Sequence, residues 1–178
     1  MAQIPSCETR FKENSKYMAQ YSGELLEKLY NEGLTQIDST FVSFAVLFIN
    51  SYESKKLIED FIIFSAPYWD SILEKDEHFF DKNVYTVFSD YPIQTVDAFR
   101  SLFKGKKPDG SNFISQEVKD KIWATLQSLI KISIKYIHRE RNPRKIDEEF
   151  IYDNPNEFSE VGNLNNLSKK WKVDLNKQ

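Results

Sequence analysis

The feature that most constrains the fold of this chain is an uninterrupted stretch from Ser115 to Arg141, which contains no glycine and no proline. At 1.5 Å per residue, such a stretch can form one helix of roughly 40 Å. Its apolar residues make more than a narrow stripe, because Trp123, Ile130 and Tyr136 widen the face formed by the others. So wide an apolar face needs partners on two sides. The stretch predicts a central helix with Ser115 as its N-cap.

The composition also favours helices. The chain has 178 residues, of which 40% are hydrophobic, but only five glycines and six prolines. β-sandwiches and β-barrels need frequent turns built on glycine and proline, so the low number of these residues argues against an all-β fold. Helical periodicity predicts helices over Thr9–Tyr30, 54–64 and 96–103, with Thr9 as the first N-cap and Gly33 closing that helix. We therefore expect an all-α bundle of about six helices in residues 1–141.

A short apolar run, FVSFAVLFI, occupies residues 41–49. Periodicity alone does not separate a strand from a helix in a run of this length. Asp38 and Ser39 offer a cap before it, and residues 50–56 continue without a turn signal, so we predict a helix. Because the run is apolar on all sides, we expect this helix to be buried all round. It is far shorter than the roughly 20 residues of a membrane span.

The segment after Pro67 has two interpretations. Asp76 follows Trp69 and Ile72 at helical spacing, although an acid does not belong on an apolar stripe. Either the helix breaks near Lys75 and Asp76 caps a new helix, or Asp76 is buried with a basic partner. We favour the cap. The clearest loop is 106–111, where Pro-Asp-Gly is typical of a turn.

The character of the chain changes after Arg141. Asn142 and Pro143 end the long helix, and residues 147–160 contain six acids and no base. We predict that residues 142–178 form a mostly extended arm. Its aromatic residues anchor the arm either on a protein partner or on its own domain, and both alternatives stay open. The candidate anchors are Phe150, Tyr152, Phe158 and Trp171.

Basic residues gather where the long helix meets the arm: Lys135, Arg139, Arg141 and Arg144. They could hold the phosphates of a nucleic acid or a lipid. Alternatively, cations at a helix C-terminus complement the helix dipole. The net charge of −3 and the acidic block that follows argue against a phosphate ligand, so we favour the second interpretation.

Motifs that would identify an enzyme are missing from the sequence. It has no phosphate-binding glycine loop and no G-x-S-x-G element, and Cys7 is the only cysteine. Asp70, Glu74 and His78 would share one face of an unbroken helix and could hold a divalent metal, but a solvated face has the same spacing. We expect no catalytic residues, no cofactor and no resident metal; a small metal-dependent enzyme is the second alternative.

Several short segments together resemble a known group of proteins. The segments are Pro67-Tyr68-Trp69-Asp70, Asp76-Glu77-His78-Phe79-Phe80, the helix 96–103, Ile122-Trp123 and the run 130–138, IKISIKYIH. Over about residues 57–140 the chain resembles uncharacterised small helical proteins of nucleocytoplasmic large DNA viruses, relatives of those in mimiviruses and phycodnaviruses. The resemblance implies a virus-encoded protein of the infected cytoplasm or the virion. It supplies no catalytic residues.

These observations lead to one functional expectation and its alternatives. We expect a cytoplasmic, non-enzymatic structural or interaction protein without a membrane span, which binds protein partners or itself through the arm. The first alternative is a regulatory module that binds nucleic acid through the basic end of the long helix. The start of the chain, MAQIPSCETRFKEN, has no apolar core of the kind that a signal peptide needs.

Overall fold

The computed structural model describes residues 5–37 and 40–141, and within these ranges the chain is helical without any strand. The elements are α1 (Cys7–Asn31), α2 (Thr40–Ser51), α3 (Ser54–Ser65), η1 (Ala66–Tyr68), α4 (Trp69–Leu73), η2 (Glu77–Phe80), α5 (Asn83–Val87), α6 (Ile93–Lys104) and α7 (Gln116–Arg141). The predicted all-α bundle is confirmed. The arm predicted for residues 142–178 lies outside the described residues.

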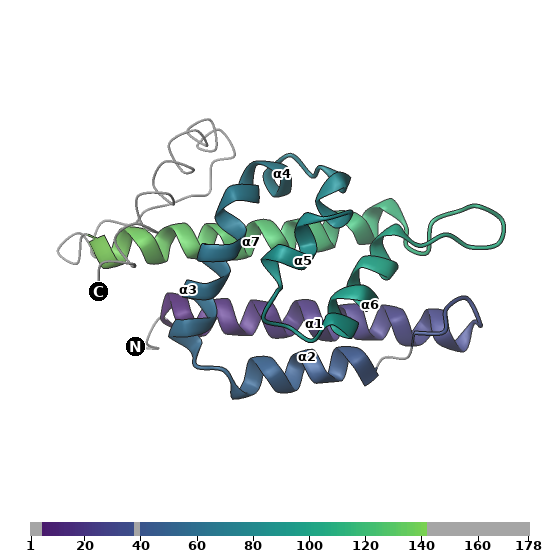
Figure 1. The fold of residues 1–178 in the computed structure, drawn as a ribbon, viewed down its shortest axis with the longest axis horizontal. Helices are drawn as coiled ribbons and strands as arrows, with labels where there is room; N and C mark the ends of the chain where they lie inside the picture. The colour runs from purple at the N-terminus through teal and green to yellow at the C-terminus, as the bar shows by residue number, and fades with distance from the viewer. Residues whose placement is uncertain (1–4, 38–39, 142–178) are drawn as a thin grey trace.

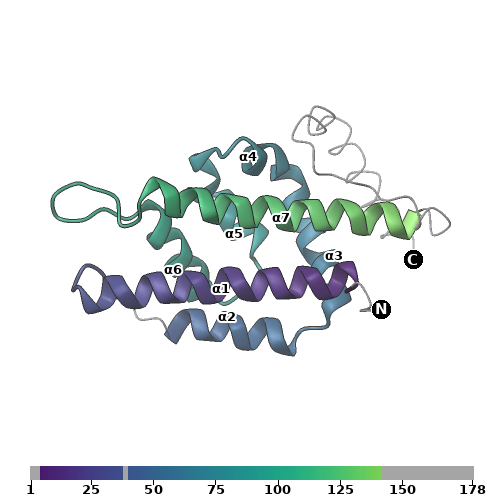
Figure 2. The ribbon, with the colours of Figure 1, turned by 180° about the vertical axis from the view of Figure 1, so that it is seen from behind.

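Two long helices form the centre of the bundle. α1 and α7 lie side by side and run in opposite directions (Figures 1 and 2). α3, α5 and α6 cross one face of this pair, and α2 lies along the side of α1 that is remote from α7 (Figure 1). The predicted central role of α7 is confirmed, and α1, which contacts α2, α3, α6 and α7, shares it.

The core is rich in aromatic rings packed against α7. Phe80 stacks on Phe103 with ring centroids 3.8 Å apart, and Trp123 meets both rings edge-on. The indole of Trp69 is buried in this region, and its Nε1 donates to Ser65 Oγ at 2.8 Å. The buried aromatic side chains of the core include Phe61, Trp69, Phe79, Phe80 and Trp123. Phe64 and Phe99 are partly buried.

Capping residues set the helix ends. α1 starts at Cys7, because the Ser6 hydroxyl accepts a hydrogen bond from the Thr9 amide at 3.2 Å and is the N-cap. The predicted N-cap at Thr9 is therefore wrong. Gly33 follows α1 with φ at 71°, as predicted for a left-handed C-terminal residue. The Ser115 hydroxyl accepts from the Val118 amide at 3.3 Å and caps α7, also as predicted.

α2 confirms the predicted helix but corrects its environment. Val42, Ala45 and Ile49 face the bundle and are buried. Phe44 and Leu47 point away from it, with 50% and 63% of their surface exposed. The expectation of a helix buried all round is wrong because α2 lies at the edge of the bundle, where only α1 and α6 make extensive contact with it. The predicted cap at Asp38 and Ser39 falls outside the described residues.

The segment 65–92 consists of short helices joined by tight turns. Lys75 has a left-handed backbone with φ at 56°, and the helical conformation of α4 does not continue through it. The Asp76 carboxylate then accepts from the His78 amide at 3.0 Å and caps η2, which confirms the predicted cap. The alternative of Asp76 buried with a basic partner does not apply.

The loop between α6 and α7 projects from one end of the bundle (Figure 1). Its base is closed by the Phe113 amide, which donates to the Gly105 carbonyl at 3.0 Å. A Cβ at Gly105 would collide with the Phe113 ring, so glycine allows this ring to lie directly on the backbone. At the tip, Asp109 accepts from the Ser111 amide at 2.9 Å and Gly110 has φ at 85°. This is the turn that the sequence predicts.

Candidate functional site

Tyr91 lies in the walls of two neighbouring cavities, which together form a cleft that we call the Tyr91 cleft. Tyr91 follows α5, and its amide donates to the Phe88 carbonyl at 3.0 Å, which turns the chain toward α6. The ring packs against Phe48 and Phe88, with centroids 4.8 Å and 5.5 Å away. Burial of this side chain strongly raises the pKa of its hydroxyl, and the nearby Asp90 carboxylate adds to the effect. The Tyr91 side chain lines both cavities.

The first cavity, which we call the serine cavity, has a volume of about 50 Å³. It lies between α1, α2 and α6 and shares Ser15, Phe88 and Tyr91 with the second cavity. Most of its wall is apolar. The lining consists of Ser15, Met18, Ala19, Ser22, Val42, Ala45, Ile49, Phe88, Tyr91, Thr95, Val96 and Phe99.

The serine cavity exists because α1 presents small side chains to α2. Ser15, Ala19 and Ser22 recur at helical spacing on one side of α1. Gly23 continues this side, and a Cβ built there would lie 3.3 Å from a methyl group of Val42. The two helices therefore approach closely at Gly23, while the small residues before it leave space.

The second cavity, which we call the aspartate cavity, has a volume of about 20 Å³ and carries Tyr52, Asp60 and Asp90 in its wall. The Tyr52 hydroxyl donates to Asp60 Oδ2 at 2.8 Å. Burial raises the pKa of Tyr52, and the hydrogen bond to Asp60 raises it further. Burial and then the repulsion from Asp60 raise the pKa of Asp90. Lys56, 5.2 Å from the centre of the Tyr52 ring, supplies a positive charge nearby.

An apolar pocket that combines a few polar groups with shifted pKa values is the feature most often associated with ligand binding. The Tyr91 cleft meets this description. No sequence motif predicts it, because its lining comes from residues as far apart as Phe11 and Leu129. The one available signal was the recurrence of small residues on α1.

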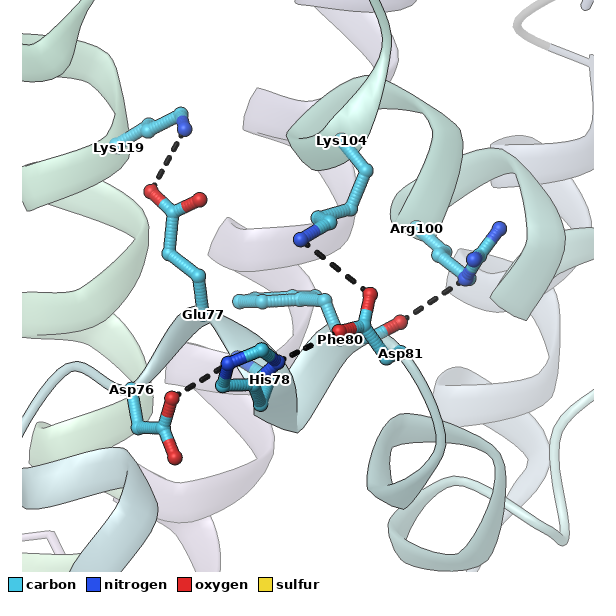
Figure 3. Close-up of polar contacts among 8 residues, drawn as sticks. All are labelled: Asp76, Glu77, His78, Phe80, Asp81, Arg100, Lys104 and Lys119. Carbon is cyan, nitrogen blue, oxygen red and sulfur yellow. Dashed lines mark hydrogen bonds and ion pairs between the residues drawn. The ribbon is translucent and has the colours of Figure 1, made fainter.

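A second polar cluster lies on the surface around η2 (Figure 3). His78 Nδ1 and Lys104 Nζ lie 3.0 Å and 3.3 Å from the two carboxylate oxygens of Asp81. The hydrogen bond from His78 and then that from Lys104 lower the pKa of Asp81. Arg100 Nε donates to the Phe80 carbonyl at 2.9 Å. These contacts tie η2 to α6.

Lys119 connects the same cluster to α7. Its ammonium lies 2.7 Å from Glu77 Oε1 (Figure 3). The same ammonium lies 5.0 Å from the centre of the Phe103 ring. Only 6% of the Lys119 side chain is exposed, whereas 44% of the Glu77 side chain is. The His78 side chain is 87% exposed and lies over no cavity of the cleft. The cluster around η2 therefore fastens η2 to its neighbours.

The helical face considered as an alternative metal site is not formed. α4 ends at Leu73, so Glu74 follows the helix and His78 belongs to η2. The spacing of Asp70, Glu74 and His78 consequently does not correspond to one helical face. Across residues 5–37 and 40–141, no three His, Cys, Asp or Glu side chains gather in a way that could hold a metal ion.

The predicted interaction residues are only partly described. Arg139 Nη1 donates to Glu8 Oε2 at 3.3 Å and links the end of α7 to the start of α1. Lys135 is partly buried one turn earlier, and Arg141 is the last residue of α7. The structure does not bring this group to the Tyr91 cleft. The remaining members lie outside the described residues: Arg144, Phe150, Tyr152, Phe158 and Trp171.

Comparison of the chain with protein-family models, with curated proteins and with solved structures finds no match. Arguments about function therefore rest on the residues of this chain. None of the helices that the structure describes has the length and hydropathy of a membrane span.

Proposed function

We propose that this chain is a non-enzymatic interaction protein that associates with a second copy of itself through the outer face of α2. The observation that carries this proposal is the pair of exposed apolar side chains on that helix. Phe44 and Leu47 lie one turn apart, and half or more of each side chain surface is exposed to solvent. Exposed apolar side chains that lie together are typical of contact sites.

The absence of charged residues from α2 supports a second copy of the chain as the partner. Between Thr40 and Ser51 there is no charged residue, although charged residues make up 29% of the chain. A two-fold contact places a surface against its own copy, so any charge near the axis would face a like charge. A helix without charges avoids this repulsion, and Phe44 and Leu47 can interdigitate with the same residues of the partner.

The small area of this contact indicates that the dimer is weak. Half-exposed Phe44 and Leu47 would bury on the order of 200 Å² per copy, whereas a stable interface buries about 800 Å² per partner. The aromatic residues predicted for the arm, Phe150, Tyr152 and Phe158, would have to supply the remaining area. The resemblance to viral helical proteins suggests a virion or an infected-cell assembly as the setting, and this belongs to the same proposal.

Sedimentation velocity of the full chain over a range of concentrations tests the proposal. We expect reversible dimerisation of the native chain and its loss in Leu47→Glu, because two glutamates would face each other. Mixing Leu47→Glu with Leu47→Lys should restore the pair as a heterodimer. Tyr30→Glu is the matched control, since Tyr30 is 48% exposed at the far end of α1 and should leave dimerisation unchanged.

The arm is tested in the same assay by replacing Phe150, Tyr152 and Phe158 with serine in the full chain. We expect weaker dimerisation. A native chain that stays monomeric at every concentration, or a dimer that persists in Leu47→Glu, would overturn the proposal.

A further inference from the structure

The aspartate cavity contains two carboxylates that share one small space. Asp60 comes from α3 and Asp90 from the connection between α5 and α6, and both belong to the wall of the same cavity of about 20 Å³. Burial and then the repulsion from Asp60 raise the pKa of Asp90, which shows that the two groups act on each other. Two like charges on one cavity are unfavourable unless a cation offsets them.

Lys56 supplies only part of the compensating charge. Its side chain is exposed, and its ammonium lies 5.2 Å from the centre of the Tyr52 ring. In the described part of the chain, no ion pair joins Lys56 to Asp60 or Asp90. Two carboxylates and one ammonium leave one negative charge without a counterpart at the cavity.

Aromatic rings form the rest of this end of the cavity. The Phe48 ring has its centroid 4.8 Å from that of Tyr52 and 4.8 Å from that of Tyr91. The Tyr91 hydroxyl makes no hydrogen bond to any residue of the described ranges. Burial first, and then Asp90 and Tyr52, raise its pKa, so this hydroxyl lies on the side of the carboxylates. Aromatic faces attract a cation within about 6 Å of the ring centre.

We propose that the aspartate cavity binds the ammonium group of a primary alkylamine. The three N–H donors of such a group match three acceptors, the carboxylates of Asp60 and Asp90 and the Tyr91 hydroxyl. The aromatic rings would surround its first carbon atom. A divalent metal ion fits less well, because Ca²⁺ takes about six to eight oxygen ligands. The cavity combines few oxygen ligands with many ring faces, which suits an organic cation.

The volume and the exposure of the wall limit the ligand. A water-sized group needs at least about 10–15 Å³ of volume measured in this way, so the cavity holds an ammonium group and at most one carbon. The wall presents polar as well as apolar atoms to this space. Asp90 is exposed, and Tyr52, Asp60 and Tyr91 are only partly buried, so the cavity reaches solvent at this end. A longer alkyl chain would leave through the same opening.

Titration of the full chain with methylammonium chloride, followed by NMR of methyl groups, tests this site. We expect saturable shifts of the Leu57 and Val87 methyl signals, which belong to the wall of the aspartate cavity. The dissociation constant should be on the order of 10 mM for a ligand of two non-hydrogen atoms. Sodium chloride at equal ionic strength should not reproduce the shifts. Tetramethylammonium, which lacks N–H donors and exceeds the volume, should not bind.

Variants that change one charge locate the ligand. Asp60→Asn and Asp90→Asn keep the shape of the side chain and should each weaken methylammonium binding about 5- to 10-fold. Lys56→Gln removes a competing cation and should strengthen binding about 2- to 3-fold. Glu74→Gln is the matched control, because it removes one exposed negative charge outside the cavity and should leave the affinity unchanged.

Nα-acetyl-lysine methylamide distinguishes two sources of the ammonium group. Binding of this compound would indicate a lysine side chain of a peptide, whereas binding of methylammonium alone would indicate a free small amine. Either result supports the proposal. Absence of saturable shifts with both compounds, or equal methylammonium affinity in the native and Asp60→Asn proteins, would overturn it.

Discussion

Replacing Ser22 with alanine is expected to stabilise the protein, which is unusual for a substitution in a packed helix. The Ser22 hydroxyl is buried and has no partner, so the folded state carries its desolvation cost without a compensating hydrogen bond. Measured costs of such groups are about 1–3 kcal/mol. Alanine also has the higher helix propensity, by up to about 0.5 kcal/mol. We expect Ser22→Ala to raise the free energy of unfolding by about 1–2 kcal/mol.

Ser133→Ala is the matched comparison, because Ser133 is also buried within a long helix. Its hydroxyl is bonded to the Leu129 carbonyl, so alanine loses about 0.5–1.5 kcal/mol and regains part of it through helix propensity. The difference between the two variants should be about 2 kcal/mol. Urea denaturation measures it directly, and the melting temperature of Ser22→Ala should rise by about 3–6 °C. If Ser22→Ala is no more stable than the native chain, the Ser22 hydroxyl has a partner and the reasoning fails.

Three further expectations concern other strained or charged positions. Lys75→Gly and Lys75→Ala both remove the exposed ion pair of Lys75 Nζ with Asp120 Oδ1 at 3.0 Å, but only glycine suits the left-handed backbone at this position. Lys75→Gly should therefore have a free energy of unfolding about 1 kcal/mol higher than that of Lys75→Ala, and equal stability of the two variants in urea would contradict this. Glu77→Gln should lower it by about 1–2 kcal/mol, since the nearly buried Lys119 ammonium loses its carboxylate, and an unchanged urea midpoint would show the pair to be dispensable. Burial and Asp60 raise the pKa of Asp90, so the folded state disfavours the ionised form. Asp90→Asn should therefore be more stable than the native chain at pH values above the ordinary aspartate pKa near 4, and this gain should be lost as the pH falls below that value. Thermal melts at pH 7 and pH 3 measure the difference in melting temperature between the variant and the native chain. A variant that is less stable at pH 7, or a difference that is the same at both pH values, would contradict this prediction.

The sequence predicts those parts of the fold that depend on local chemistry. The caps at Asp76 and Ser115 use a side-chain oxygen and a nearby amide, so a few neighbouring residues determine them. The N-cap of α1 is Ser6 and not the predicted Thr9; both residue types can cap a helix, and their hydroxyl groups lie 3.2 Å apart. An ambiguity of this kind shifts a helix boundary by a few residues without changing the fold.

Long-range packing was harder to predict. The run 41–49 is apolar on every side, so nothing in its periodicity indicates that Phe44 and Leu47 face solvent. The Tyr91 cleft depends on how α1, α2 and α6 pack together, because each of these helices contributes residues to its lining. Ser22 itself could not be singled out, because a serine on a helix normally bonds to its own backbone or to water. Only the structure shows that this hydroxyl is buried and makes no hydrogen bond to its own helix.

The loop between α6 and α7 offers a position for adding sequence to this protein. Phe113 lies on Gly105 and closes the base of the loop, and the Lys107 amide donates to the Ser111 carbonyl at 2.7 Å just above it. The tip at Asp109 and Gly110 is exposed and packs against no helix. A peptide inserted between these two residues would leave the base, and with it the register of α6 against α7, in place. An epitope or a fluorescent reporter could be displayed there, far from α2 and the Tyr91 cleft.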